Sequence, residues 1–174
     1  CPNHASHLDA PTVRFALPAH LRDRSAIAAA ADFWFQGNPA GSLVALLLGA
    51  LPFARTSDVR ASLDHVANMV NDGWSVMIFP EGTRARDGQL GPMRNGIGLL
   101  ATSLHVPVVP VHIDGTWAIL PPGQTLPTIR GRRPVRVRFG QPLVIDPSMG
   151  IQAATESIGQ AIAALAADAS SARG

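Results

Sequence analysis

The stretch Phe79-Pro80-Glu81-Gly82-Thr83-Arg84 determines how we interpret the whole chain. It follows Trp74-Ser75-Val76-Met77-Ile78, a short apolar run that predicts a buried strand. Pro80 should end this strand, because proline cannot donate a hydrogen bond to a sheet ladder. The polar residues after it would then lie at the carboxyl end of a strand, which is where open α/β sheets usually bind ligands.

These polar residues have the chemistry of a phosphate site. Gly82 would allow the backbone to approach an oxyanion closely, Thr83 offers a hydroxyl donor, and Arg84 offers a fork that can bind phosphate through two hydrogen bonds. The alternative is a solvated turn in which Glu81 and Arg84 pair on the surface. Composition alone favours this second interpretation.

A second polar stretch, Asn3-His4-Ala5-Ser6-His7-Leu8-Asp9, lies near the start of the chain. Residues five apart on a helix point about 140° from each other, so His4 and Asp9 can meet only if His4 lies in a loop and Asp9 in the first turn of a following helix. Ser6 suits this arrangement as the N-cap, with Asp9 three residues later as in a capping box. A neutral imidazole can then take a proton from a hydroxyl, while the carboxylate fixes its tautomer.

Simpler interpretations of the same stretch stay open. Asp9 could be only a capping acid and His4 only a loop histidine. A metal site made of His4, His7 and Asp9 is a further alternative, but no other cluster of cysteine and histidine follows in the sequence, so we predict no metal.

Composition restricts the class of protein. A chain of 174 residues with 47% hydrophobic and 15% charged residues suits one α/β domain, and we find no internal repeat and no second domain. All 14 basic residues are arginine, so the pI of about 9.9 follows from a net charge of only +2. With 5% aromatic residues and no basic aromatic platform, we expect no nucleic-acid partner.

The single cysteine, Cys1, allows no disulfide within the chain and gives no support to an oxidising compartment. The sequence has no apolar run of roughly 18 residues and no visible signal peptide. It does not begin with methionine, so we expect a domain over 1–174 that is truncated at its N-terminus.

Periodicity and breaker residues place the other elements. Residues 25–31 fit a strand or a helix equally well. Gly73 should close the helix that precedes the strand over 74–78. The remaining expectations are helices over 11–21 (ending near Pro18), 58–71, 92–105 and 152–169, an irregular strand over 106–113, a loop over 116–134 and a half-exposed strand over 135–139.

The apolar run Gly41–Leu51 is too short to span a bilayer. We interpret it as a core helix, with a membrane-surface helix beside Phe33-Trp34-Phe35 as the alternative. Arg55 comes directly after this region and could be ordinary surface charge.

Taken together, the chain resembles the PlsC-type glycerolipid acyltransferases, which are 1-acyl-sn-glycerol-3-phosphate acyltransferase-like proteins. Residues 3–9 look like the first block of the family, NHxxxxD, and residues 49–55 resemble the second, a glycine and an apolar stretch before an arginine. Residues 79–84 match the third block, FPEGTR, and residues 106–111 match the fourth, an apolar run around a proline. Residues 139–143 are similar to a later FGxPL-like stretch.

The resemblance implies a single domain with a mixed β-sheet flanked by helices. It implies that His4 is the base and Asp9 its partner, and that Arg55 and the loop of Glu81, Gly82, Thr83 and Arg84 hold the phosphate of the acceptor. An acyl group would pass from acyl-CoA or acyl-ACP, as co-substrate and with no cofactor, to a hydroxyl of a lysophospholipid.

The same resemblance implies a protein that is peripheral or anchored at the cytoplasmic face of the membrane. Two other functions stay open. One is thioester or ester hydrolysis, with His4 activating water. The other is a catalytically silent module that binds anionic lipid at the membrane surface.

Overall fold

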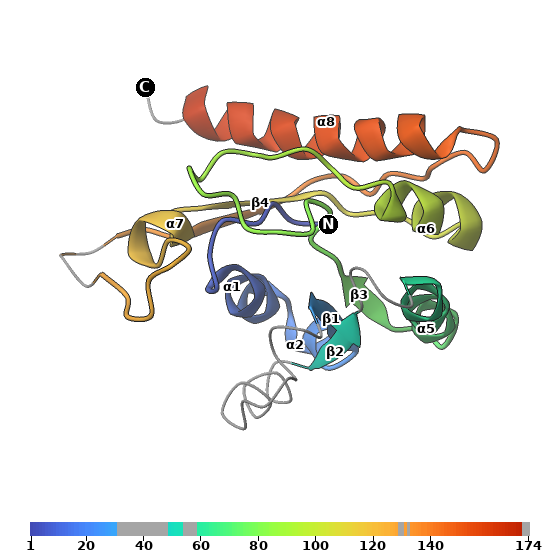
Figure 1. The fold of residues 1–174 in the computed structure, drawn as a ribbon, viewed down its shortest axis with the longest axis horizontal. Coiled ribbons are helices and arrows are strands. Elements are labelled where there is room, and N and C mark those ends of the chain that lie inside the picture. Colours follow the sequence, from blue (N-terminus) through green and yellow to red (C-terminus); the bar gives the residue numbers. More distant parts are fainter. Residues whose placement is uncertain (31–48, 54–58, 129–130, 132, 172–174) are drawn as a thin grey trace. The chain divides into compact units, whose positions relative to one another are not determined.

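A computed structural model describes the chain except for residues 31–48, 54–58, 129–130, 132 and 172–174 (Figure 1). Contacts group the described residues into two compact units, one of residues 1–13 and 79–174 and the other of residues 14–78. Helices and strands alternate along the chain, which confirms the predicted α/β class. The assignment of residues 1–174 to one domain stays a prediction.

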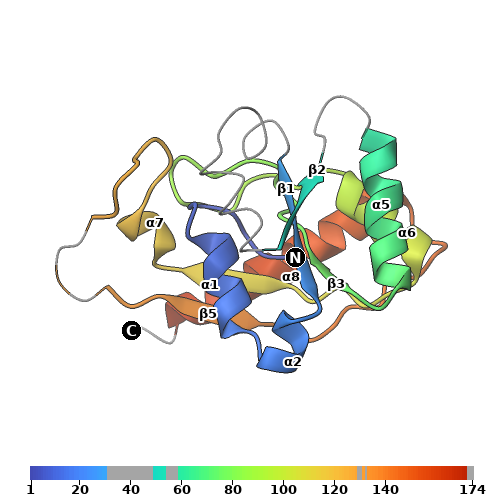
Figure 2. The same cartoon turned by 90° about the horizontal axis from the view of Figure 1, so that it is seen from below.

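The unit of residues 14–78 is built on a parallel sheet in the order β2-β1-β3, formed by β1 (Ser25–Ala30), β2 (Ala50–Phe53) and β3 (Ser75–Met77) (Figure 2). Ile27 at the centre of β1 pairs with Ala50 on one side and Met77 on the other. The short α2 (Ala19–Arg22) precedes β1, and α5 (Val59–Asn71) connects β2 to β3 and contacts both. A long connection of this kind is what two parallel strands require.

Gly73 ends α5 as predicted. Its φ of 82° lies in the left-handed region, and its N–H donates to the Val70 carbonyl at 3.0 Å while the Trp74 N–H donates to the Met69 carbonyl, also at 3.0 Å. This pair of bonds is a Schellman motif, which satisfies carbonyls that a helix end leaves without partners. The chain therefore turns sharply from α5 into β3.

The unit of residues 1–13 and 79–174 is built around the antiparallel pair of β4 (Val111–Asp114) and β5 (Arg136–Phe139). The long α8 (Ile151–Ser171) packs on β4 and on α6 (Gly96–Leu104), as Figure 1 shows. Ile158 and Ile162 of α8 are completely buried. Pro2 forms a parallel bridge to Val111, so the segment that carries His4 starts at the edge of β4.

The expected helix over 11–21 forms α1 (Asp9–Ala16) and α2, which are separated at Pro18, and residues 25–31 contain strand β1. The strand over 106–113 was wrong in extent, because β4 begins only after Pro110 and Val108 makes an isolated bridge to Leu143. The helix over 92–105 begins four residues late, at Gly96. The loop over 116–134 was wrong at its start, where residues Thr116–Ile119 form α7.

Four of the other predicted elements are confirmed. The strands over 74–78 and 135–139 and the helices over 58–71 and 152–169 are present as β3, β5, α5 and α8. Burial was overestimated for β3, because Ser75 is exposed and only Met77 is buried. The helix over 41–51 was wrong at its end, since Ala50 begins β2, while residues 33–35 and 41–48 lie outside the described part. No helix in that part is sufficiently long and apolar to cross a membrane.

Candidate active site

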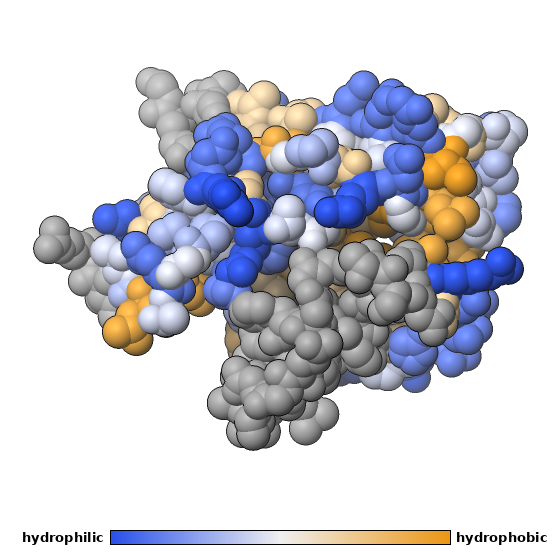
Figure 3. Space-filling model, viewed as in Figure 1, coloured by the Kyte–Doolittle hydropathy of each residue, from blue (hydrophilic) through white to orange (hydrophobic). Residues whose placement is uncertain are grey.

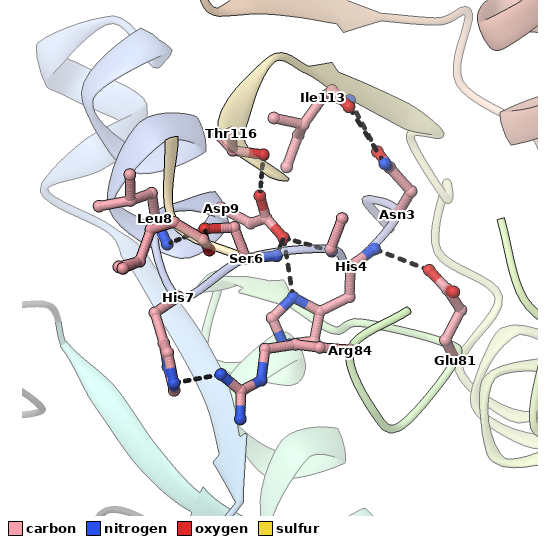
Figure 4. Close-up of polar contacts among 12 residues, drawn as sticks. Asn3, His4, Ser6, His7, Leu8, Asp9, Glu81, Arg84, Ile113 and Thr116 are labelled. Carbon is pink, nitrogen blue, oxygen red and sulfur yellow. Dashed lines mark hydrogen bonds and ion pairs between the residues drawn. The ribbon is translucent and has the colours of Figure 1, made fainter. Parts of the chain in front are cut away.

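His4 and Asp9 meet as the sequence predicted. The Nδ1 atom of His4 lies 2.9 Å from the Oδ2 atom of Asp9 (Figure 4). His4 lies in a loop and Asp9 is the first residue of α1, which is the arrangement that a spacing of five residues requires. The side chain of His4 is 20% exposed and that of Asp9 is fully buried. The imidazole therefore reaches solvent while its carboxylate partner does not.

The carboxylate of Asp9 is surrounded by donors. Its Oδ2 atom accepts the backbone N–H groups of Ala5 at 2.6 Å and Ser6 at 2.7 Å, and its Oδ1 atom accepts the hydroxyl of Thr116 at 2.6 Å. A buried carboxylate needs such partners, because removing the charge from water is otherwise costly. The bond from the Ser6 N–H is one half of the predicted capping box, while the Ser6 hydroxyl accepts the N–H of Leu8. Asp9 thus caps α1 and also binds His4.

This geometry fixes the tautomer of His4. Because Nδ1 faces a carboxylate that can only accept, the proton of the neutral ring lies on Nδ1 and the lone pair lies on Nε2. No described residue makes a hydrogen bond to Nε2. The ring of Phe79 stacks on the imidazole, with 4.0 Å between ring centroids. His4 consequently has the form and the orientation of a general base.

The backbone beside His4 is fixed on two sides. The side-chain amide of Asn3 donates to the Ile113 carbonyl at 3.1 Å and accepts the Ile113 N–H at 2.7 Å. These two bonds resemble the backbone bonds between paired strands. On the other side, the His4 N–H donates to Glu81 at 2.7 Å and the His4 carbonyl accepts the N–H of Ala85 at 2.8 Å. The first and third sequence blocks are therefore joined directly at His4.

Glu81 does not pair with Arg84 on the surface, so the solvated-turn interpretation was wrong. Its side chain is only 5% exposed, and its second carboxylate oxygen accepts the N–H of Gly91 at 2.8 Å. Burial raises the pKa of Glu81, and the hydrogen bonds from Gly91 and His4 oppose that rise. Both carboxylate oxygens of Glu81 therefore bind backbone N–H groups, one of which belongs to His4, the candidate base.

Arg84 contacts His7 through a hydrogen bond from its guanidinium to the Nε2 atom of His7. Burial and the nearby Arg84 charge lower the pKa of His7 to about 4. A neutral imidazole that accepts from a guanidinium is a poor metal ligand, so the geometry does not favour the metal alternative of His4, His7 and Asp9. The described residues contain no group of three side chains arranged to hold a metal ion.

The rest of the loop supplies a second arginine that no sequence pattern singled out. The Nε atom of Arg94 donates to the Glu81 carbonyl at 3.3 Å, and a Cβ atom at Gly82 would lie 2.6 Å from its Cδ atom. Gly82 also has a φ of 69°, so glycine is favoured there for two reasons. Thr83 is exposed. Arg55 lies outside the described residues, and phosphate binding by this loop stays a prediction.

Thr116 was also missed. The sequence predicted a loop at this position, whereas the structure places Thr116 at the start of α7, 107 residues from its partner Asp9. Local patterns cannot reveal a contact over such a separation. The only local signal is Gly115, whose φ of 95° turns the chain from β4 into α7.

Comparisons with known proteins identify the family of this chain. A family model described as Acyltransferase matches residues 1–114. A chloroplastic 1-acyl-sn-glycerol-3-phosphate acyltransferase of Brassica napus is 41% identical over 80 residues, which are 44% of this chain and 23% of the relative. The human 1-acyl-sn-glycerol-3-phosphate acyltransferase beta is 33% identical over 113 residues, 63% of this chain and 38% of the relative. The matched region thus spans well under half of either relative.

Among solved structures, the chain is similar to the crystal structure of the 1-acyl-sn-glycerophosphate acyltransferase PlsC from Thermotoga maritima. The TM-score is 0.70 at 21% sequence identity, and the match covers 93% of this chain and 61% of that one. At this level of identity the similarity establishes the fold.

Proposed function

We propose that this chain, which belongs to the acyltransferase family, moves a fatty acyl group from an acyl thioester to a hydroxyl of a lysophospholipid such as 1-acyl-glycerol-3-phosphate. The observation that carries the proposal is the contact between His4 and the buried Asp9, which leaves the lone pair on Nε2 to accept a proton. The names of the relatives and of the PlsC neighbour support this choice of acceptor.

In this reaction Nε2 of His4 takes the proton of the acceptor hydroxyl while the hydroxyl oxygen attacks the thioester carbonyl carbon. Asp9 stabilises the imidazolium that forms. The carbon–sulfur bond then breaks, and the leaving thiolate takes the proton from His4. A thioester is already activated, so a positioned base can suffice without a covalent intermediate, and such a base contributes about 10²–10⁴-fold in rate. The co-substrate is acyl-CoA or an acyl carrier protein, and no cofactor enters.

The phosphate of the acceptor binds to the loop that follows Pro80. Arg84 supplies a charge-assisted hydrogen bond of about 1.5–3 kcal/mol, with Thr83, the backbone at Gly82 and Arg55 as further donors. For Glu81 we propose a positioning role in place of direct phosphate contact, because two backbone donors occupy its carboxylate and its charge has the same sign as that of phosphate. The carboxylate holds the base and the phosphate loop in one arrangement.

The lipid acceptor implies work at a membrane surface, and we propose attachment at its cytoplasmic face. The segment that begins with α7 exposes apolar side chains, with Trp117 39% and Leu126 79% exposed. Figure 3 shows hydrophobic surface over the loop that follows α7. Exposed tryptophan and leucine side chains are typical of interfacial contact with lipid. Co-sedimentation with anionic vesicles, compared between wild type and Leu126→Ser, tests this attachment.

The function itself is tested by release of free thiol from a long-chain acyl-CoA, with and without lysophosphatidic acid. Acyl transfer predicts thiol release that depends on the acceptor and matches the phosphatidic acid formed. Equal release without acceptor would instead indicate a hydrolase. Absence of release with either acyl-CoA or acyl carrier protein as donor would favour the silent lipid-binding module.

A further inference from the structure

Thr116 is the only described residue that binds the Oδ1 atom of Asp9. The three other donors to this carboxylate, which include Nδ1 of His4, all contact Oδ2. Thr116 is 1% exposed and Asp9 is fully buried, so water has no ready access to replace the hydroxyl. The two oxygens of the carboxylate therefore have separate partners (Figure 4).

We propose that Thr116 is a positioning residue of the proposed acyl transfer, acting on His4 through Asp9. Its hydroxyl fixes the rotation of the carboxylate, so that Oδ2 stays aligned with Nδ1 of His4. This inference rests on the proposed function for its kinetic effect but not for its effect on the hydrogen bond between Asp9 and His4.

The fold holds Thr116 in place independently of Asp9. At the end of α7, the Leu120 carbonyl accepts the hydroxyl of Ser6 at 2.7 Å. Within α7, the indole N–H of Trp117 donates to the Arg86 carbonyl at 3.2 Å. The segment is thus attached to the loop after His4 and to the loop after Arg84. A hydroxyl carried by such a segment can orient the carboxylate, since it does not depend on the carboxylate for its own position.

Other ionisable groups also face His4. Asp9 contacts its ring, and Glu81 contacts its backbone N–H. His7 lies near enough to interact electrostatically with both His4 and Arg84. The hydroxyl of Thr116 binds Asp9 and neither Glu81 nor His7, so of these three groups only Asp9 should change its contact with His4 when the hydroxyl is removed.

The test is Thr116→Val, which keeps the shape of the side chain and removes the hydroxyl. We expect kcat to fall about 10- to 100-fold, the scale of a lost hydrogen bond to a charged group, with the KM values of both substrates within about twofold. We also expect the NMR resonance of the His4 Nδ1 proton to change, because the carboxylate is no longer held in line with that proton. Thr116→Ser should restore both the kcat and the resonance.

Thr155→Val is the matched control. Thr155 is a buried threonine of α8 whose hydroxyl donates to the Ile151 carbonyl at 2.8 Å, so the control loses a similar bond away from the site. It should leave kcat and the His4 Nδ1 proton resonance unchanged. If Thr116→Val does not fold, Thr116→Cys takes its place, because a thiol is a weaker donor of similar size.

An unchanged His4 Nδ1 proton resonance in a folded Thr116→Val or Thr116→Cys protein would overturn the inference, even if activity fell, because the contact would then be only structural. A resonance that changes equally in Thr116→Ser would overturn it as well. The NMR measurement requires no substrate. If the wild type transferred no acyl group, the proposed function would fail while the link from Thr116 to His4 could still be measured.

Discussion

Replacing Glu81 by glutamine tests whether this carboxylate holds the base and the phosphate loop together. Glutamine has nearly the same shape, but its amide has one acceptor oxygen and one NH₂ group that can only donate. Glu81 accepts two backbone N–H groups, from His4 at 2.7 Å and from Gly91 at 2.8 Å. In Glu81→Gln, one of these N–H groups must face a donor and loses its partner.

The size of the effect follows from this loss. A hydrogen bond to a charged group contributes about 1.5–3 kcal/mol, and the bond that remains becomes a weaker neutral one. Part of this is offset, because burial of the charge in the native protein is unfavourable, as the raised pKa of Glu81 indicates. We expect a net decrease of about 2–3 kcal/mol in the free energy of unfolding, which lowers the melting temperature by roughly 5–10 °C in a chain of this length. Activity should also fall, since His4 moves with its backbone.

Thermal melts followed by circular dichroism, together with thiol release, measure both effects. Glu156→Gln is the matched control, because Glu156 is exposed on α8 and its carboxylate accepts, among the described residues, only from Gln152. It should melt within about 2 °C of the wild type and keep its activity. A Glu81→Gln protein that melts and turns over like the control would refute the positioning role.

Three further predictions concern single residues. Arg84→Ala should raise the KM for the lysophospholipid roughly tenfold or more with little change in kcat, measured by steady-state kinetics. A large fall in kcat at unchanged KM would contradict phosphate binding by Arg84. The pKa of His7 is lowered from 6.5 to about 4, so between these pH values the unfolded chain binds more protons than the folded one. The free energy of unfolding should therefore fall as the pH drops from 6.5 to 4. In urea melts, His7→Gln should reduce this dependence of stability on pH. Gly98→Ala should lower the free energy of unfolding by about 1–3 kcal/mol, because the added Cβ would collide with the Ile151 carbonyl. Gly96 has open space around it, so Gly96→Ala should not destabilise the protein. Equal melting temperatures of the two variants would contradict the packing of α6 on α8.

The sequence predicted those parts of the site that depend on local rules. A spacing of five residues between His4 and Asp9, with Ser6 between them, suffices to place one residue in a loop and the other in the first turn of a helix. The end of α5 at Gly73 follows from the same kind of rule. In both cases the residues that decide the structure lie within one or two turns of each other.

The parts that were missed depend on contacts between distant residues. The bonds from His4 to Glu81 and from Thr116 to Asp9 join residues 77 and 107 positions apart, and no periodicity encodes them. The extent of β4 was misjudged because an apolar run of β-branched residues continues through Pro107 and Pro110, although neither proline can donate to a ladder. Pairing with β5 decides where that strand begins.

The most direct test of the central claim is the rate of thiol release by His4→Ala in the presence of lysophosphatidic acid, relative to the wild type. If Nε2 of His4 is the base, the rate should fall by about 10²–10⁴-fold while the melting temperature stays close to that of the wild type. A folded His4→Ala protein that transfers the acyl group at the wild-type rate would contradict the account.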